Sequence, residues 1–315
     1  MSALLKITNL EVDFQIKGIV VNSPLRGMNL EIKAGKTLGI VGETGCGKTL
    51  TATAVMGLLP SSAVQRGLIE FAEHGALKSD EMASLRGSEI TMIFQNPQSA
   101  FNPIFTVGAQ LKMVAQRRNI ARAEIGSLLI QRLESVGLKD TKRILACYPH
   151  QLSGGMLQRC MIAMALISSP KLLIADEPTT ALDATIGDQV LSLIVSLQKS
   201  EGFAMLFISH DVSAVAKVSD EIAVVYAGRI VETGPTRDVI NSPQHPYTRG
   251  LLGAIPSADK TRGKLVAIPG NVPSDLTSLV GCAFADRCSQ RVDKCAQEPV
   301  LKLLKNQSVA CWEAG

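Results

Sequence analysis

Short apolar segments with two different periods make up the amino-terminal part of the chain. Apolar and polar residues alternate from Leu4 to Phe14 and again from Met28 to Ile32, which is typical of strands with one buried face. Leu38 to Val41 is apolar throughout, as in a strand of a parallel sheet that is buried on both faces. Lys48 to Leu59 has the apolar spacing of a helix. The pattern therefore predicts a strand, a loop and a helix in succession, preceded by edge strands of a sheet.

The middle of the chain has helical spacing and lacks the pattern of a buried strand. Val107 to Gln116 and Ile125 to Val136 are helical stretches, and we interpret residues 101–168 as a helical insertion. Beyond it, Lys171 to Ala175 predicts a buried strand and Ala184 to Lys199 a helix. Strands that alternate with helices in this way predict an α/β fold with a parallel sheet.

The alternation ends near Asn241. Glu221 to Tyr226 and Arg229 to Glu232 predict a last hairpin, with its turn at Ala227-Gly228. Closely spaced prolines then interrupt the pattern: Pro243, Pro246, Pro256, Pro269 and Pro273. We therefore predict a domain at residues 1–240 and a small C-terminal extension at residues 241–315.

The composition excludes several classes of protein. No apolar run approaches the roughly 18 residues that a membrane-spanning helix needs, and the first residues lack the basic and apolar regions of a signal peptide. The formal net charge is +4, and no segment combines clustered Lys and Arg with aromatic residues, so nucleic acid is not expected as a partner. We expect a chain that stays in the cytoplasm.

One motif directly follows the fully apolar segment. It fits the pattern G-x-x-x-x-G-K-[ST] and consists of Gly42, Glu43, Thr44, Gly45, Cys46, Gly47, Lys48 and Thr49. In such a loop the glycines let the backbone curl, so that successive N–H groups point at phosphate oxygens. Lys48 would reach the β- and γ-phosphates, and the Thr49 hydroxyl would bind Mg²⁺. The motif predicts a nucleoside triphosphate site, and the Cys46 thiol predicts that alkylation inhibits it.

Two carboxylates end the buried strand that begins near Leu172. Asp176 is placed to hold the Mg²⁺ shell, and Glu177 could polarise a water for in-line attack on the γ-phosphate. Such a pair also occurs as ordinary chemistry at a helix start. The phosphate-binding loop in the same chain favours the functional interpretation.

A second phosphate site is predicted at Ser153, Gly154 and Gly155. Ser153 is a good N-cap, which is the structural interpretation of its position. Two glycines in a first turn lower helix stability, which suggests that the backbone there closely approaches a ligand. Exposed N–H groups at a helix N-terminus bind phosphate.

Read in order along the chain, these motifs resemble those of the nucleotide-binding subunit of an ATP-binding cassette (ABC) transporter, over residues 1–240. The correspondence comprises Walker A at Gly42 to Thr49, the Q-loop Gln95, the signature Ser153 to Gly155, Walker B at Leu172 to Glu177, the D-loop Ala181 to Asp183, and the switch His210. The resemblance implies a P-loop ABC-type ATPase domain with a RecA-like core, an antiparallel β subdomain and a helical subdomain. It also implies that ATP binds between Walker A of one chain and the signature of another.

The resemblance also implies roles for single residues. Glu177 would be the general base, and His210 would contact the γ-phosphate. Gln95 would sense Mg²⁺ and couple to the transmembrane subunits, Phe14 would stack on the base, and Asp183 would lie at the nucleotide site. One departure is Met156, where the family usually has Gln.

Further residues indicate a subfamily. Gln244 to Thr248, together with Phe94 to Pro97, is similar to segments of the oligopeptide/dipeptide and nickel importer ATPases, and matches the first, dipeptide-D-like, subunit better than the second. Such ATPases imply a heterodimer of ATPase subunits on the cytoplasmic face of the inner membrane. They work beneath two permeases that an extracytoplasmic substrate-binding protein supplies.

This resemblance favours an ATPase that powers import of dipeptides or oligopeptides, with ATP and Mg²⁺ as cofactors. An importer of nickel or metal chelates is the alternative within the family. A soluble ABC ATPase outside transport is more remote, because neither a long coiled-coil insertion nor a second cassette is visible. A nearly inactive partner subunit conflicts with the filled catalytic positions Gln95, Glu177 and His210.

Four cysteines crowd the end of the extension. Cys282, Cys288, Cys295 and Cys311 have five, six and fifteen residues between neighbours, whereas structural zinc sites usually contain a closer Cys pair. Four thiolates without such a pair suit a [4Fe–4S] cluster, and the family has cysteines at matching positions. The family often has Pro where Ser289 stands. Zn²⁺ and free thiols remain alternatives.

Overall fold

The computed structural model describes residues 3–118, 120–254, 268–273 and 275–314. Its contacts divide the chain into two compact units, which are described separately below. Unit 1 consists of Met1–Lys33, Thr37–Lys78 and Phe207–Gly315, and unit 2 of Ala34–Lys36 and Ser79–Leu206. The predicted boundary near Asn241 lies inside unit 1 and stays a prediction.

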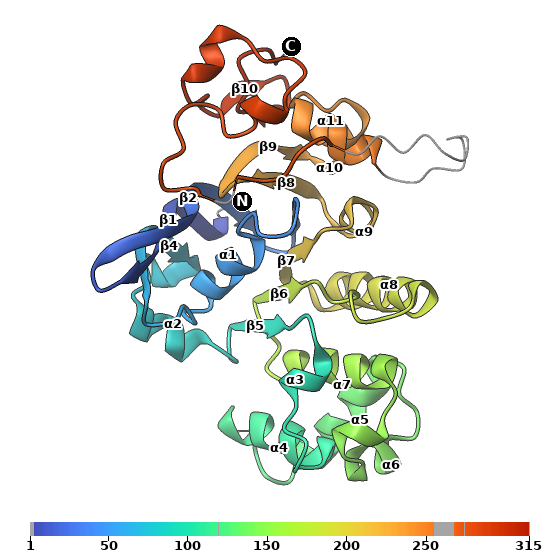
Figure 1. Cartoon of the computed structure of the whole chain (residues 1–315). Coiled ribbons are helices and arrows are strands. Elements are labelled where there is room, and N and C mark those ends of the chain that lie inside the picture. Colours follow the sequence, from blue (N-terminus) through green and yellow to red (C-terminus); the bar gives the residue numbers. More distant parts are fainter. Residues whose placement is uncertain (1–2, 119, 255–267, 274, 315) are drawn as a thin grey trace. The chain divides into compact units, whose positions relative to one another are not determined.

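Unit 1 contains a three-stranded antiparallel sheet with β1 at its centre (Figure 1). The strands are β1 (Ala3–Ile16), β2 (Ile19–Lys33) and β4 (Ala63–Phe71). Leu5 and Ile7 of β1 are buried, and so are Leu10 and Val12, so the alternation changes phase at the irregular pairing between Ile7 and Leu10. β4 was not predicted, because Gly67 interrupts it and its apolar residues, two of which (Val64 and Leu68) are exposed, do not alternate with polar ones.

A second group of strands in unit 1 carries the phosphate-binding loop. β3 (Thr37–Val41) pairs in parallel with β8 (Glu221–Tyr226), and β8 pairs antiparallel with β9 (Arg229–Pro235). The predicted hairpin at Ala227-Gly228 is confirmed, and both turn residues have positive φ. The extension adds β11 (Gln307–Val309) to β9 and β10 (Lys302–Leu304) to β11. The sequence did not predict β10 and β11, because three residues are too few to show an alternation of apolar and polar positions.

The helices of unit 1 lie beside these strands and in the extension (Figure 1). They are α1 (Lys48–Val55), α9 (Val212–Val218), α10 (Thr236–Asn241), α11 (Pro246–Gly253) and the short 3-10 helices Ala72–His74, Ala285–Arg287 and Asp293–Ala296. α1 is shorter than predicted, because the chain turns at Met56 and Gly57.

Unit 2 combines a parallel strand pair with a group of helices. β5 (Ile90–Ile93) pairs in parallel with β6 (Leu172–Asp176), and α7 (Gly154–Leu166) packs against β5. The remaining elements are α2 (Ser79–Leu85), α3 (Pro97–Ala100), α4 (Val107–Arg117), α5 (Ile125–Ser135), α6 (Thr141–Ala146), α8 (Ala184–Glu201) and the 3-10 helix Pro149–Gln151. β7 (Ala204–Ser209) spans the division between the units.

The two helices predicted inside the helical insertion are present, while its bounds at residues 101–168 stay a prediction. α4 and α5 begin at the predicted residues, and α3 to α7 lie together in the lower part of Figure 1. α6 was missed because its six residues are too few to show the periodic spacing of apolar residues that identifies a helix. In the described part of the chain, every helix is too short or too polar to cross a bilayer.

Candidate functional site

The predicted site residues are divided between the two units. Unit 1 carries Phe14 on β1, Gly42 to Thr49 after β3, and His210 after β7. Unit 2 carries the others: Gln95 after β5, Ser153 to Gly155 at the start of α7, Asp176 and Glu177 at the end of β6, and Asp183 before α8. Phe14 is half-buried and His210 is exposed. Their predicted contacts with a nucleotide stay predictions.

Glycines define the curl of the phosphate-binding loop. A side chain at Gly42 would collide with the backbone oxygen of Val225 on β8, so only glycine fits there. Gly47 has φ 104° at the N-cap of α1, and a side chain would meet Leu25. L-amino acids rarely adopt this left-handed conformation. The requirement for these two glycines therefore follows from the fold itself.

Lys48 lies against the backbone of its own loop. Its Nζ donates hydrogen bonds to the carbonyl oxygens of Gly42 (2.7 Å) and Glu43 (2.9 Å), and the residue is only 5% exposed. Cys46 is fully buried beside it, and burial raises the pKa of the Cys46 thiol. The expected inhibition by alkylation does not fit this structure, because a buried, protonated thiol is a poor nucleophile.

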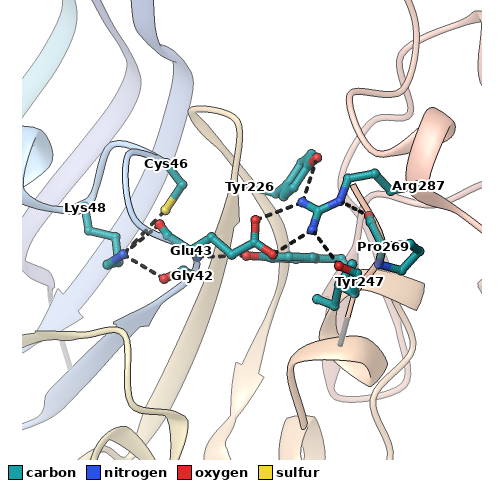
Figure 2. Close-up of polar contacts among 9 residues, drawn as sticks. Gly42, Glu43, Cys46, Lys48, Tyr226, Tyr247, Pro269 and Arg287 are labelled. Carbon is teal, nitrogen blue, oxygen red and sulfur yellow. Dashed lines mark hydrogen bonds and ion pairs between the residues drawn. The ribbon is translucent and has the colours of Figure 1, made fainter. Parts of the chain in front are cut away.

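Glu43 has partners that the sequence did not reveal (Figure 2). The Glu43 backbone N–H donates to the Tyr247 hydroxyl oxygen at 2.9 Å. The Glu43 carboxylate accepts two hydrogen bonds from the Arg287 guanidinium, at 2.8 and 3.0 Å. The signal for Tyr247 was present in the segment Gln244 to Thr248, but nothing in the sequence connected it to the loop.

Glu177 has an unusual backbone conformation, and its carboxylate accepts two hydrogen bonds. Its φ is 47°, in the left-handed region that few non-glycine residues occupy. Gln95 Nε2 donates to Glu177 Oε2 at 2.9 Å, and Thr180 Oγ1 donates to the same oxygen at 2.8 Å. Unit 2 thus brings together the predicted residues Gln95 and Glu177, and adds Thr180, which the sequence analysis missed. Asp176 precedes them as the buried last residue of β6.

The signature residues have structural roles in this conformation. Ser153 caps α7 by accepting a hydrogen bond from the Met156 N–H at 3.3 Å. A side chain at Gly155 would meet Ile186 at 2.9 Å, so packing against α8 already favours glycine there. Asp183 caps α8 in the same way, through the Ile186 N–H at 3.0 Å. These contacts orient the start of both helices.

The four cysteines of the extension lie near one another. Burial, with a smaller contribution from the neighbouring Cys295, Cys311 and Cys288, raises the pKa of the Cys282 thiol to about 11. Backbone N–H groups of Gln290 and Glu313 donate to the sulfurs of Cys288 and Cys311, at 3.3 and 3.4 Å. All four cysteines belong to the described part of the chain, and no three of their sulfur atoms lie within 4.8 Å of one another.

A strand, a glycine-rich loop with a terminal lysine, and a helix are together the structure of a P-loop nucleotide site. The ABC transporter family model matches residues 25–180, and the model of the oligopeptide/dipeptide transporter C-terminal region matches residues 231–295. A bacterial ABC transporter cassette solved as a dimer is similar, with a TM-score of 0.63 and 25% identity over 74% of this chain and 99% of that one. The predicted ABC-type ATPase fold is confirmed.

Two curated relatives extend the similarity over almost the whole chain. The dipeptide transport ATP-binding protein DppD of Bacillus subtilis is 41% identical, covering 99% of this chain and 95% of the relative. The oligopeptide transport ATP-binding protein OppD of Escherichia coli is 42% identical, covering 95% and 90%. The chain belongs to the ABC transporter ATPase family, as a member with the oligopeptide/dipeptide transporter C-terminal region.

Proposed function

We propose that this ATPase powers the import of dipeptides or oligopeptides across the cytoplasmic membrane. The observation that carries the proposal is the similarity to peptide transport ATPases through both the cassette and the C-terminal extension. ATP and Mg²⁺ are its cofactors, as the family implies. The chain itself never needs to contact the peptide, because binding and hydrolysis of ATP supply the work.

The site residues suit this activity. Lys48 would exchange its loop carbonyls for phosphate oxygens, which are stronger, charged partners, and Thr49 and Asp176 would hold Mg²⁺. Glu177 is the proposed general base, with its carboxylate oriented by Gln95 and Thr180. Phe14, His210, Ser153 to Gly155 and Asp183 keep their proposed nucleotide contacts.

The chain is proposed to work with partners at the membrane. A second ATPase subunit would complete the nucleotide sites, and two permeases would bind the helical part of unit 2. Apolar side chains exposed there support a docking surface: Ile104, Phe105, Met113 and Tyr148. A substrate-binding protein would deliver the peptide from the other side. The position is therefore peripheral, on the cytoplasmic face of the inner membrane.

We also propose that the four cysteines of the extension hold a [4Fe–4S] cluster. Backbone N–H groups that donate to sulfur are a feature that tunes iron–sulfur sites. Iron and acid-labile sulfide would be assayed in anaerobically purified protein. Stoichiometric zinc without iron would contradict the proposal.

Growth of a strain that lacks this gene tests the transport proposal. The strain should fail to grow on a dipeptide or tripeptide as the sole source of a required amino acid, and should recover with the wild-type gene but not with Glu177→Gln. A parallel assay measures a nickel-dependent enzyme in the same strain. Normal peptide growth with loss of the nickel-dependent activity would replace peptide by nickel as the cargo.

A further inference from the structure

Glu43 is the acidic residue of the phosphate-binding loop, and the C-terminal extension neutralises it. Arg287 pairs with both carboxylate oxygens, and the Arg287 side chain is 7% exposed against 26% for Glu43. A bidentate ion pair of this kind fixes the orientation of the carboxylate and also neutralises its charge. Without Arg287, an unpaired carboxylate would lie on the loop where ATP phosphates are proposed to bind.

The extension holds Arg287 firmly in place. Arg287 Nε donates to the Pro269 carbonyl oxygen at 2.8 Å, and the guanidinium also donates to the Tyr226 hydroxyl at 3.3 Å. The guanidinium lies 5.7 Å from the ring centre of Tyr226 and 5.8 Å from that of Phe284. Such contacts leave the side chain little rotational freedom. Arg287 therefore does not need to be ordered when a nucleotide binds.

Tyr247, the second partner of Glu43, is fixed just as firmly. It is fully buried, and its ring packs 4.6 Å from the ring centre of Tyr226 and 5.4 Å from that of Phe284. The Tyr247 backbone N–H donates to His245 Nδ1 at 3.0 Å, at the start of α11. The hydroxyl that accepts the Glu43 N–H therefore comes from a rigid aromatic cluster.

Both contacts act on the residue whose carbonyl also binds Lys48. The Glu43 N–H is held by Tyr247, its carboxylate by Arg287, and its carbonyl oxygen by Lys48 Nζ. Restricting the two peptide units on either side of the Glu43 Cα reduces the conformational freedom that the loop loses when it wraps a phosphate chain. The contacts with Arg287 and Tyr247 thus favour binding through both electrostatics and preorganisation.

We propose that Arg287 and Tyr247 are positioning residues of the ATP site, so that the C-terminal extension sets the nucleotide affinity of the phosphate-binding loop. The inference rests on the proposed role of Gly42 to Thr49 as the ATP-phosphate loop. We call the contacts of Arg287 and Tyr247 with Glu43 the loop clamp. The segment Gln244 to Thr248, which marks the subfamily in the sequence, thereby acquires a role: it supplies the Tyr247 hydroxyl.

Isothermal titration of the full chain with ADP tests the loop clamp without hydrolysis. Arg287→Ala should raise the dissociation constant of ADP about tenfold, and Tyr247→Phe, which removes only the hydroxyl, about fivefold. The KM for ATP should rise in parallel while kcat changes much less. Arg287→Lys restores the charge without the two-point geometry and should recover part of the affinity.

Two further variants separate positioning from a purely structural role. Glu43→Gln in the Arg287→Ala background removes the unpaired charge and should bring the affinity back toward wild type. Arg291→Ala is the matched control, since Arg291 pairs with Asp286 in the same segment, but both side chains are exposed. This control should leave both ADP affinity and KM unchanged.

The outcomes are distinguishable. If Arg287→Ala and Tyr247→Phe bind ADP with wild-type affinity, the proposal of the loop clamp is wrong. The same holds if these variants lower the thermal unfolding midpoint without changing the ADP affinity, because the contacts would then be purely structural. Failure of the double variant to regain affinity overturns the electrostatic part of the proposal. A wild-type chain that neither binds ADP nor hydrolyses ATP overturns the proposed function itself, and the loop clamp with it.

Discussion

Two glutamates, one in each unit, are held in different ways. Glu177 in unit 2 accepts hydrogen bonds from Thr180, three residues later, and Gln95, 82 residues earlier. Glu43 in unit 1 contacts Tyr247 and Arg287, which are 204 and 244 residues away. The donors to the Glu177 carboxylate come from the cassette, whereas the donor to the Glu43 carboxylate, Arg287, comes from the extension. This difference suggests that the cassette positions the residues for ATP hydrolysis, whereas the extension controls the nucleotide affinity.

The largest expected effect tests the Glu177 half of this comparison. Glu177→Gln removes the proposed base but keeps the size of the side chain, so ATP turnover should fall by about 10² to 10⁴. ADP affinity should stay near wild type, because Glu177 is not in the phosphate-binding loop. Steady-state ATPase assays with Glu134→Gln, an exposed glutamate on α5, as the control would check this. Full turnover in Glu177→Gln would remove it as the base.

The next effect tests the Glu43 half, through the glycine that precedes it. Gly42→Ala places a methyl group against the Val225 carbonyl, which cannot move without disturbing β8, so the free energy of unfolding should fall by about 3 kcal/mol. ADP binding should be lost as well. Gly45→Ala is the comparison. Gly45 has φ 84°, but a Cβ added there would have no neighbouring atom within 4 Å, so the free energy of unfolding should fall by only about 1 kcal/mol. Chemical denaturation and titration with ADP would measure both.

The sequence predicted the local parts of both regions. The loop, the strand ends at Asp176 and Gln95, and the capping residue Ser153 belong to short motifs whose residues are neighbours in the chain. The pairing of Glu43 with Arg287 depends instead on how the extension packs on β8 and β9, and no spacing rule encodes it. Thr180 was missed for a different reason: threonine after a Walker B motif has no distinctive pattern. Contacts between distant segments required the structure.

His245, which accepts a hydrogen bond from the Tyr247 backbone N–H, should make the stability of the folded chain depend on pH. Burial, together with the positive charge of nearby Arg249, lowers the pKa of His245 to about 4, so His245 is neutral in the folded chain at pH 7. The Glu232 carboxylate faces this turn but accepts the His245 backbone N–H. Below the unfolded pKa of about 6.5, the unfolded chain binds a proton that the folded chain does not. Stability is therefore fully present above that pH and falls as the pH decreases towards 4.

His245→Asn isolates this contribution, because asparagine keeps an acceptor for the Tyr247 N–H but does not titrate. Between pH 7 and pH 5 the wild type should lose about 2 kcal/mol more unfolding free energy than the variant. Urea denaturation at the two pH values would measure the difference. Equal losses in both proteins would show that His245 does not titrate as described.

The smallest expected effect divides the support of Glu177 between its two donors. Thr180→Val keeps the shape of the side chain and removes the hydroxyl bonded to Glu177 Oε2. Gln95 still donates to that oxygen, so kcat should fall only about fivefold, as for the loss of one hydrogen bond, with the KM for ATP unchanged. Thr8→Val, at an exposed threonine of β1, is the control for the substitution itself. If Thr180→Val instead raised KM and left kcat alone, residues around Glu177 would set nucleotide affinity too, and the division between the two glutamates would fail.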